Sequence, residues 1–289
     1  MYEINSQKPL VSVIIPSFNH EVYIRDAIIS VINQTYTNIE LIVVDDGSTD
    51  NSINIIDELQ KRYHFIKIFQ SNKGLSKTLT DTIKNYCNGY YISVCASDDY
   101  WREDKIEVQV KFMQLNVNNA MCYSKCYYID EKSNLKFQNI RENMYKGGNI
   151  FNDLLLVKYN LPVSYLIKKE VLKEIGYYPD NIYCEDFYMN LKISKNYTIG
   201  FIDDYLMFYR VQANSYKKAL KIIKSQYAIL LDYQNESIYK KALLEWKLRS
   251  FSMQSYYPEL KRECISFVFD LKLIFHLRYW KSILKLIIK

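Results

Sequence analysis

Three pairs of adjacent acidic residues carry side chains that could do chemistry: Asp45-Asp46, Asp98-Asp99 and Glu185-Asp186. Carboxylate oxygens suit hard cations such as Mg²⁺ and Mn²⁺, and two carboxylates leave room for a diphosphate on the same ion. Adjacent acids also raise each other's pKa, which helps one of them to act as a base. Such pairs are just as ordinary in solvated turns and helix starts, so the surrounding elements decide their meaning.

The first two pairs follow apolar runs that have the length of buried strands. Each run leads to apolar residues at helical spacing, as in Ile53, Ile56 and Leu59. Four successive strand–helix units with short joints predict an α/β fold, with a mainly parallel central sheet flanked by helices. In such sheets ligands bind beyond the carboxyl ends of the strands. The predicted strands cover residues 11–15, 41–44, 66–69 and 90–96, and Pro16 ends the first.

The chain is less regular from residue 120 onward. A strand is expected over 121–129, a loop at Gly147-Gly148, and helices over 150–157 and 185–194. We interpret this part as the second half of the same domain. From Tyr216 the sequence contains no glycine and predicts only helices.

Composition excludes several classes of protein. The chain has 289 residues, of which 49% are hydrophobic and 24% charged, so disorder throughout is excluded. No run of eighteen apolar residues occurs, and the polar start at residues 1–9 lacks the apolar core of a secretory signal. We therefore expect a cytoplasmic protein. The six cysteines lack the spacing of a zinc site or a disulfide framework.

Charge divides the chain near Ser215. Residues 1–215 hold 23 Lys and Arg against 26 Asp and Glu, a net −3, whereas residues 216–289 hold 15 against 6, a net +9. A cationic tail on an acidic body argues against a nucleic-acid-binding surface, which would place basic residues on the main face. The glycine motifs of dinucleotide enzymes and P-loop kinases are also absent, so their usual phosphate cradle is missing.

Six polar motifs follow one another along the chain at definite spacing. They are Pro16-Ser17-Phe18-Asn19, Val43-Val44-Asp45-Asp46-Gly47-Ser48-Thr49-Asp50, Asn72-Lys73-Gly74, Ser97-Asp98-Asp99, Cys184-Glu185-Asp186 and Tyr209-Arg210. In their order and spacing these motifs resemble the inverting family 2 nucleotide-sugar glycosyltransferases, closely over residues 9–101 and more loosely to residue 215. The resemblance implies the GT-A fold over residues 1–215, with a donor-binding half at about 9–115 and an acceptor half at about 116–215, followed by a basic helical region at 216–289.

On the donor side, the resemblance places the nucleotide base at Pro16, Phe18, Asn19, Asp45 and Asp46. Phe18 would stack on the base, and Asp46 would accept a hydrogen bond from a uracil-type N–H. Two plainer interpretations stay open: Phe18 as a core aromatic, and Asp46-Gly47-Ser48 as a simple turn.

Asp98 matches the position that faces the ribose, and Asp99 the position that binds the metal. Mn²⁺ or Mg²⁺ at Asp99 would offset the charge that grows on the leaving nucleoside diphosphate. Lys73 is a candidate phosphate contact, and a solvated surface lysine is the equal alternative.

An inverting transfer needs a base that takes the proton from the acceptor hydroxyl. The resemblance assigns that role to Asp186, with Glu185 as its support. The alternative is that both acids only begin a helix, where negative charge is favourable.

Many relatives carry a histidine two residues after the Tyr-Arg pair, whereas this chain has Gln212, which puts metal affinity in question. Arg210 is a candidate diphosphate contact, or else a structural arginine in a buried network. Trp101 is a candidate for the acceptor pocket, or else for core packing.

The end of the tail predicts a cationic amphipathic helix over residues 271–289. Basic residues recur three or four apart, and apolar residues gather on the other side of the helix. The basic residues are Arg278, Lys281, Lys285 and Lys289, and the apolar residues are Leu277, Trp280, Ile283, Leu284, Ile287 and Ile288. Such a helix suits an anionic membrane surface, although packing on the catalytic domain is the equal alternative.

We therefore expect a metal-dependent inverting glycosyltransferase of hexosyl or N-acetylhexosaminyl type. It would move a sugar from a nucleotide donor, a UDP-sugar, to a hydroxyl of a growing surface polysaccharide or lipid-linked oligosaccharide such as capsule or lipopolysaccharide. The enzyme would be cytoplasmic and peripheral on the inner membrane. The alternatives are a non-catalytic nucleotide-sugar sensor or assembly partner, and a nucleotidyltransferase of related fold.

Overall fold

The computed structural model describes residues 8–136, 142–180, 182–211, 216–260, 262, 264–270 and 272–288. The chain forms two compact units. The first comprises Met1–Ile150, Leu161–Asn181 and Lys192–Gln212, and the second comprises Phe151–Asn160, Ile182–Leu191 and Ala213–Lys289. The division of the chain at residue 215 stays a prediction.

An eight-stranded sheet in the order β3-β2-β1-β4-β7-β6-β8-β5 forms the centre of the first unit. The first four of these are parallel, β7 is antiparallel to both of its neighbours, β6 and β8 are parallel, and β5 is antiparallel to β8. The mainly parallel sheet that the sequence predicts is therefore confirmed. The strands are β1 Val11–Ser17, β2 Ile39–Asp45, β3 Ile66–Phe69, β4 Tyr91–Val94, β5 Tyr100–Trp101, β6 Asn119–Ile129, β7 Leu166–Lys168 and β8 Thr198–Arg210.

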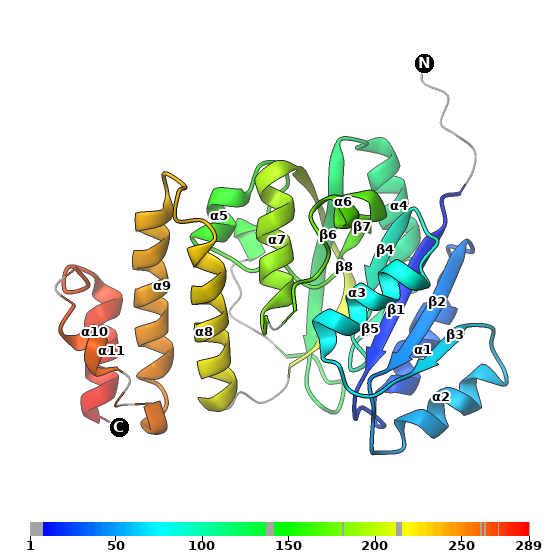
Figure 1. Ribbon diagram of the computed structural model, residues 1–289, viewed down its shortest axis with the longest axis horizontal. Coiled ribbons are helices and arrows are strands. Elements are labelled where there is room, and N and C mark those ends of the chain that lie inside the picture. The colour runs from blue at the N-terminus through cyan, green and yellow to red at the C-terminus, as the bar shows by residue number, and fades with distance from the viewer. Residues whose placement is uncertain are drawn as a thin grey trace. The chain divides into compact units, whose positions relative to one another are not determined.

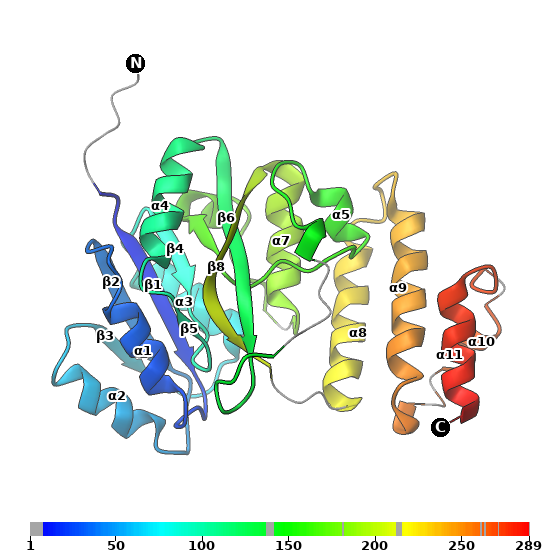
Figure 2. The same cartoon turned by 180° about the vertical axis from the view of Figure 1, so that it is seen from behind.

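Helices flank this sheet, with α1 and α3 on opposite faces (Figures 1 and 2). The apolar spacing explains the packing of α1, because its buried residues Ile24, Ala27, Ile28 and Val31 recur every three or four positions. The four strand–helix units are thus present. The helices around the sheet are α1 Ile24–Ile32, α2 Ser52–Gln60, α3 Leu75–Asn85, α4 Lys105–Leu115 and α6 Lys169–Glu174, and α7 Glu185–Asn196 belongs to both units.

Strand β1 does not end at Pro16, as the sequence suggested, but continues to Ser17. Its last residues still pair with β2, Pro16 opposite Val44 and Ser17 opposite Asp45. Pro16 points to the same side as Ile14, whose carbonyl accepts the Cys95 N–H on the β4 side at 2.9 Å. Because the β1–β4 pairing stops at Ile14, the missing N–H of the proline costs no ladder hydrogen bond.

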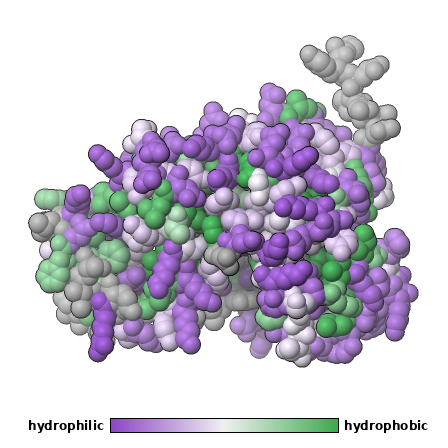
Figure 3. Space-filling model, in the orientation of Figure 1, coloured by the Kyte–Doolittle hydropathy of each residue, from purple (hydrophilic) through white to green (hydrophobic). Residues whose placement is uncertain are grey.

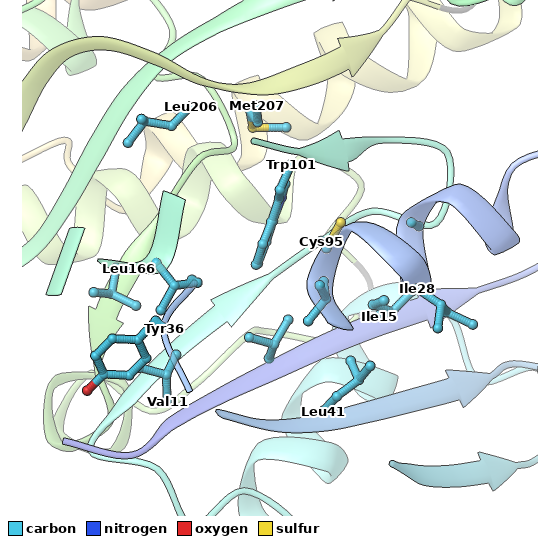
Figure 4. Packing of buried hydrophobic residues seen from close by; sticks show 14 of the residues in the cluster. Val11, Ile15, Ile28, Tyr36, Leu41, Cys95, Trp101, Leu166, Leu206 and Met207 are labelled. Carbon is cyan, nitrogen blue, oxygen red and sulfur yellow. The ribbon is translucent and has the colours of Figure 1, made fainter. Parts of the chain in front are cut away.

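The main core lies between the sheet and helices α1, α2 and α4. It joins residues from both ends of the sheet, including Ile15 on β1, Trp101 on β5 and Met207 on β8 (Figure 4). Burial of these apolar side chains stabilises the sheet whose strand ends carry the polar motifs.

The second unit is helical, which confirms the predicted helical C-terminal region. A smaller core forms between its last helices, where Leu248 and Phe251 on α9 pack against Leu273 and Tyr279. None of the described helices is long and apolar enough to cross a membrane. Its helices are α5 Phe151–Leu155, the start of α7, α8 Tyr216–Leu231, α9 Tyr239–Gln254, α10 Ile265–Val268 and α11 Leu277–Ile288.

One lysine lies entirely within the core of the first unit. The Nζ atom of Lys105 is 2.7 Å from Gln109 Oε1 and 3.3 Å from Ser93 Oγ, and it lies 3.9 Å from the centroid of the Trp101 ring. No carboxylate of the described residues forms an ion pair with it. Burial therefore lowers the pKa of Lys105 to about 7.

We expect Lys105→Met to change how stability depends on pH. Between about pH 7 and the pKa of roughly 10.4 in the unfolded chain, only the unfolded state binds this proton, so the unfolding free energy of the wild type rises with pH. Without this titration, the slope of the unfolding free energy against pH should be smaller by up to about 1.4 kcal/mol per pH unit. Urea unfolding at pH 7.5 and 8.5 measures the difference.

Lys111→Met is the matched control, because Lys111 is exposed on the same helix. It should leave the slope as in the wild type. Equal slopes in the wild type and Lys105→Met would show that the buried lysine keeps its proton.

Candidate active site

The loops after β1 and β2 are joined by polar contacts at the carboxyl ends of these strands. Asn19 adopts a left-handed conformation, with φ of 55°, and its Oδ1 accepts the Thr49 N–H at 2.8 Å. Its own N–H donates to Ser48 Oγ at 2.9 Å. Asparagine tolerates this backbone conformation better than most residues, which explains its place in the predicted base-binding motif.

Asp45 organises the turn that follows it. Its Oδ1 accepts the N–H groups of Gly47 and Ser48, at 3.2 and 2.8 Å, and its Oδ2 accepts the Ser48 hydroxyl at 2.6 Å. The side chain is buried. Asp45 therefore shapes the floor of the candidate site, and the turn that the sequence allowed is present.

Asp46 reaches the loop after β3. Its Oδ1 accepts from Gln70 Nε2 at 2.8 Å and from the Lys73 N–H at 3.0 Å, while its Oδ2 accepts the Gly74 N–H at 3.0 Å. Gly74 has φ of 83°, a conformation that favours glycine. One carboxylate thus fixes the Asn72-Lys73-Gly74 motif, and its predicted bond to a base would use the remaining acceptor capacity.

Phe18 is 45% exposed, so the structure does not place it in the core. It lies one residue after the end of β1, beside Asn19. The ring is available for stacking, as the base-binding prediction requires.

The loop after β4 carries Ser97, Asp98 and Asp99. The Ser97 hydroxyl lies 2.7 Å from His20 Nδ1, which links this loop to the loop after β1. His20 is a residue of this edge that the sequence motifs do not include, although its position directly after Pro16–Asn19 is a usable signal. The ends of β1, β2, β3 and β4 thus meet at one edge of the sheet.

Asp98 is half-buried and Asp99 is buried, with 2% of its surface exposed. The Asp99 Oδ1 atom accepts the backbone N–H of Arg210 at 2.8 Å. Burial and the neighbouring charge of Asp98 raise the pKa of Asp99 well above its usual range. The pair concentrates negative charge in a poorly solvated place, which is the environment that a divalent cation neutralises.

These carboxylates fit a metal that takes the rest of its ligands from a substrate. No group of three or more His, Cys, Asp or Glu in the described part of the chain could hold an ion by itself. Mg²⁺ and Mn²⁺ sites in phosphate enzymes commonly use one or two carboxylates, with waters and phosphate oxygens completing the shell. Asp98 and Asp99 supply such a set.

Arg210 lies in a buried network. Its Nε donates to the Asp98 carbonyl at 2.8 Å, its Nη1 to the Asp130 carbonyl at 2.6 Å, and its Nη2 to Ser133 Oγ at 3.2 Å. Its guanidinium carbon lies 4.2 Å from the centroid of the Tyr23 ring. This arrangement favours the structural alternative, and the diphosphate contact stays a prediction.

Trp101 and Lys73 lie where the alternative interpretations of the sequence expect them, in the core and at the surface. Trp101 belongs to the main core, where Figure 4 shows it among apolar side chains. Lys73 is partly exposed, and its Nζ lies 3.5 Å from a carboxylate oxygen of Asp81. Acceptor contact by Trp101 and phosphate contact by Lys73 both stay predictions.

Glu185 and Asp186 form the first turn of α7 in the second unit. The Cys184 N–H donates to Ser225 Oγ on α8 at 3.0 Å, which fixes the chain just before them. Burial and the charge of Asp186 raise the pKa of Glu185 to about 8, and burial raises the pKa of Asp186. A raised pKa makes a carboxylate a stronger base, although the pair also begins a helix as the alternative expected.

The structure brings together the nucleotide and metal candidates of the first unit, which come from the loops after β1, β2, β3 and β4. Glu185 and Asp186 belong to the second unit and are described there alone. Gln212 lies outside the described residues. The roles assigned to these residues stay predictions.

Comparison with known proteins gives a consistent result. Residues 12–176 match the family described as glycosyl transferase family 2. The glycosyltransferase GlyG of Streptococcus pneumoniae serotype 4 is 32% identical over 226 residues, which are 71% of this chain and 72% of GlyG.

Two solved structures share the fold. S. aureus TarS 1-349 in complex with UDP-GlcNAc has a TM-score of 0.65 and 16% identity, over 94% of this chain and 79% of TarS. The mannosyltransferase PcManGT of Pyrobaculum calidifontis, in complex with GDP-Man and Mn²⁺, has a TM-score of 0.66 and 14% identity, over 98% of this chain and 87% of PcManGT.

We expect Arg210→Lys to lower the unfolding free energy by about 3 kcal/mol. Lysine keeps the charge but cannot reach the two buried carbonyls of Asp98 and Asp130 together, so at least one acceptor loses its partner. Urea unfolding monitored by circular dichroism measures the change.

Arg62→Lys is the control, because Arg62 is exposed and its side chain forms a surface ion pair with Glu58, with 3.5 Å between Nη2 and Oε1. It should change the unfolding free energy by less than about 0.5 kcal/mol. An equally small effect of Arg210→Lys would contradict the network's contribution to the fold.

Proposed function

Since the chain belongs to glycosyl transferase family 2, we propose that it is a metal-dependent inverting enzyme that transfers a sugar from a UDP-sugar to an acceptor hydroxyl. Its membership makes it a glycosyltransferase with the GT-A fold. The observation that carries the finer proposal is the convergence of Asp46, Phe18, Asp98 and Asp99 at one edge of the sheet.

The donor site would work through a few fixed contacts. The exposed ring of Phe18 is free to stack on the nucleotide base, and Asp46 holds the loop beside it. Asp98 would contact the ribose. UDP-GlcNAc in the TarS structure and GDP-Man in the PcManGT structure support a nucleotide-sugar donor. UDP follows from the proposed role of Asp46 as the acceptor of a uracil-type N–H.

Asp99 would hold Mn²⁺ or Mg²⁺, with Asp98 beside it at the ribose. The ion, when bound, supplies positive charge to the leaving diphosphate. The residues of the chain prepare this place: Arg210 fixes one oxygen of Asp99 through its backbone N–H and fixes the Asp98 carbonyl through its side chain. The second oxygen of the Asp99 carboxylate would hold the ion.

Asp186 would take the proton from the acceptor hydroxyl as that oxygen attacks the anomeric carbon. The bond between that carbon and the diphosphate oxygen breaks, and attack from the opposite face inverts the configuration. The partly buried Glu185 would help to keep the pKa of the pair in the range where a base is effective.

The acceptor we propose is a growing surface polysaccharide or a lipid-linked oligosaccharide. An enzyme that extends a lipid-linked glycan would work at the cytoplasmic face of a membrane, and the cationic tail supports a peripheral position there.

Two alternatives predict different behaviour. A non-catalytic nucleotide-sugar sensor would bind donor without turning it over. A nucleotidyltransferase of related fold would carry a glycine-rich basic loop after the first strand, where this chain has Pro16–His20.

We expect UDP binding to need both Mn²⁺ and the carboxylate of Asp99. In titration calorimetry, Asp99→Asn should weaken UDP binding at least tenfold in the presence of Mn²⁺ and should have little effect in its absence. Binding of UDP that is the same in both variants with Mn²⁺ would contradict the metal assignment.

Asp57→Asn is the matched control for this titration. Asp57 lies on α2 and forms an ion pair with Lys67, so its loss removes one negative charge from the same unit outside the site. Its UDP affinity should equal that of the wild type. GDP in place of UDP tests the choice of base.

We expect Asp186→Asn to lower sugar transfer about 10²- to 10⁴-fold, because the amide cannot accept the proton of the acceptor hydroxyl. Release of UDP from UDP-sugars, with oligosaccharide acceptors, measures the rate. The affinity for UDP should stay unchanged, which separates a lost base from a lost donor site.

Asp232→Asn is the control, since Asp232 is exposed in the same unit. Donor turnover that is equal in Asp186→Asn and the wild type would remove the base assignment. Binding of donor with no turnover in any variant would favour the sensor.

A further inference from the structure

The last helix of the second unit, α11, presents three chemically distinct stripes. One stripe packs into the small core, a second is apolar and exposed, and the third is cationic. A helix advances about 100° per residue, so residues three, four and seven apart share a stripe. The packed stripe holds Tyr279, Ser282, Ile283 and Leu286, the apolar stripe Leu277, Trp280 and Leu284, and the cationic stripe Arg278, Lys281 and Lys285.

Contacts of the packed stripe fix the rotation of α11 about its own axis. Tyr279 contacts Phe251 of α9, with 5.5 Å between the ring centroids, and Arg278 Nη1 lies 2.7 Å from Glu245 Oε2 on the same helix. The Tyr279 hydroxyl also donates to the Val268 carbonyl at 2.9 Å. The other two stripes consequently keep an outward orientation.

The exposed stripe is large and apolar for a surface in water. Leu277 is 71% exposed, Trp280 53% and Leu284 55%. The chain before α11 adds two exposed rings, Phe269 and Phe275. Figure 3 shows apolar residues gathered over α10 and α11, at the left of the view. Clustered exposed apolar side chains of this kind mark an interaction surface.

Trp280 is prepared for an apolar environment. Its indole N–H already donates to the Ile274 carbonyl at 2.8 Å. Moving the ring out of water would therefore leave no unpaired donor, which is the main cost of burying tryptophan.

Charge identifies the kind of partner. On the helical wheel the cationic stripe lies directly beside the exposed apolar stripe, so both would meet the same surface. The segment 216–289 carries a net +9, whereas residues 1–215 carry a net −3. A second copy of this face would bring like charges together, whereas a bilayer with anionic headgroups provides opposite charge and an apolar interior.

We propose that the outward half of α11 binds the surface of an anionic lipid bilayer. Leu277, Trp280 and Leu284 enter the boundary between headgroups and acyl chains, while Lys281 and Lys285 contact the headgroups. The helix lies in the plane of the membrane and does not cross it. This inference rests on the peripheral position proposed above and not on sugar transfer.

Vesicle binding of the full chain tests the proposal. Sedimentation with vesicles of phosphatidylcholine containing 30% phosphatidylglycerol should recover the protein, whereas pure phosphatidylcholine should recover far less. Lys281→Gln/Lys285→Gln should weaken binding to the anionic vesicles roughly 20-fold. Lys240→Gln/Lys241→Gln is the matched control, because it removes the same charge from exposed positions on α9 and should leave binding unchanged.

Tryptophan fluorescence gives a second measurement. Anionic vesicles should shift the emission of the wild type to shorter wavelength, and brominated lipids should quench it. Both effects should fall sharply in Trp280→Tyr, because the other two tryptophans lie outside the exposed stripe: Trp101 is buried in the first unit, and Trp246 on α9 packs against Tyr227 and Phe267. Circular dichroism confirms that this variant is folded.

Three results would overturn the inference. Equal binding of Lys281→Gln/Lys285→Gln and its α9 control would remove the cationic stripe from the contact. Equal binding to neutral and anionic vesicles would remove the charge argument. A dimer in solution that Leu284→Ser dissociates, without vesicle binding, would assign the face to a second copy. Transfer to a water-soluble acceptor is measured separately, so none of these results bears on the catalytic proposal.

Discussion

The hydrogen bonds of the buried Arg210 are the interactions on which the candidate donor site depends most. Its guanidinium joins the carbonyls of Asp98 and Asp130, which belong to different segments of the first unit, and its backbone N–H holds Asp99. A buried guanidinium is stable only when its N–H groups have hydrogen-bond acceptors, and here each of its three nitrogens has one. The network fixes the backbone at Asp98 and one oxygen of Asp99, the residue proposed to bind the divalent ion.

Much of the fold could be predicted from sequence because parallel strands buried on both faces leave a strong signal. The run Leu41–Val44 is apolar throughout, and the spacing of Ile53, Ile56 and Leu59 defines the helix after it. The polar ends of these strands then had to meet at one edge. The sequence alone therefore predicts where the Asp45-Asp46 and Asp98-Asp99 loops lie.

The rest of the fold could not be predicted from the sequence, because it depends on contacts between residues that are far apart in the chain. Strands β5 and β7 have two and three residues, too few for a pattern, and β8 contains Asp203 and Asp204 where its pairing with β6 shifts register. Nothing local indicates that Trp101 packs in the core. Helix α11 shows the same limit, because its sequence does not indicate which face packs, and only the contacts with α9 identify that face.

The hydrogen bonds of Asp46 to the loop after β3 determine which substitutions that loop can accept. At residues 73 and 74 the donors are the backbone N–H groups, not side chains. The loop keeps its shape whatever side chain stands at position 73, whereas position 74 demands glycine because of its left-handed backbone. Replacing Lys73 would therefore leave the Asp46 contacts in place, whereas any other residue at position 74 would strain the backbone that Asp46 holds.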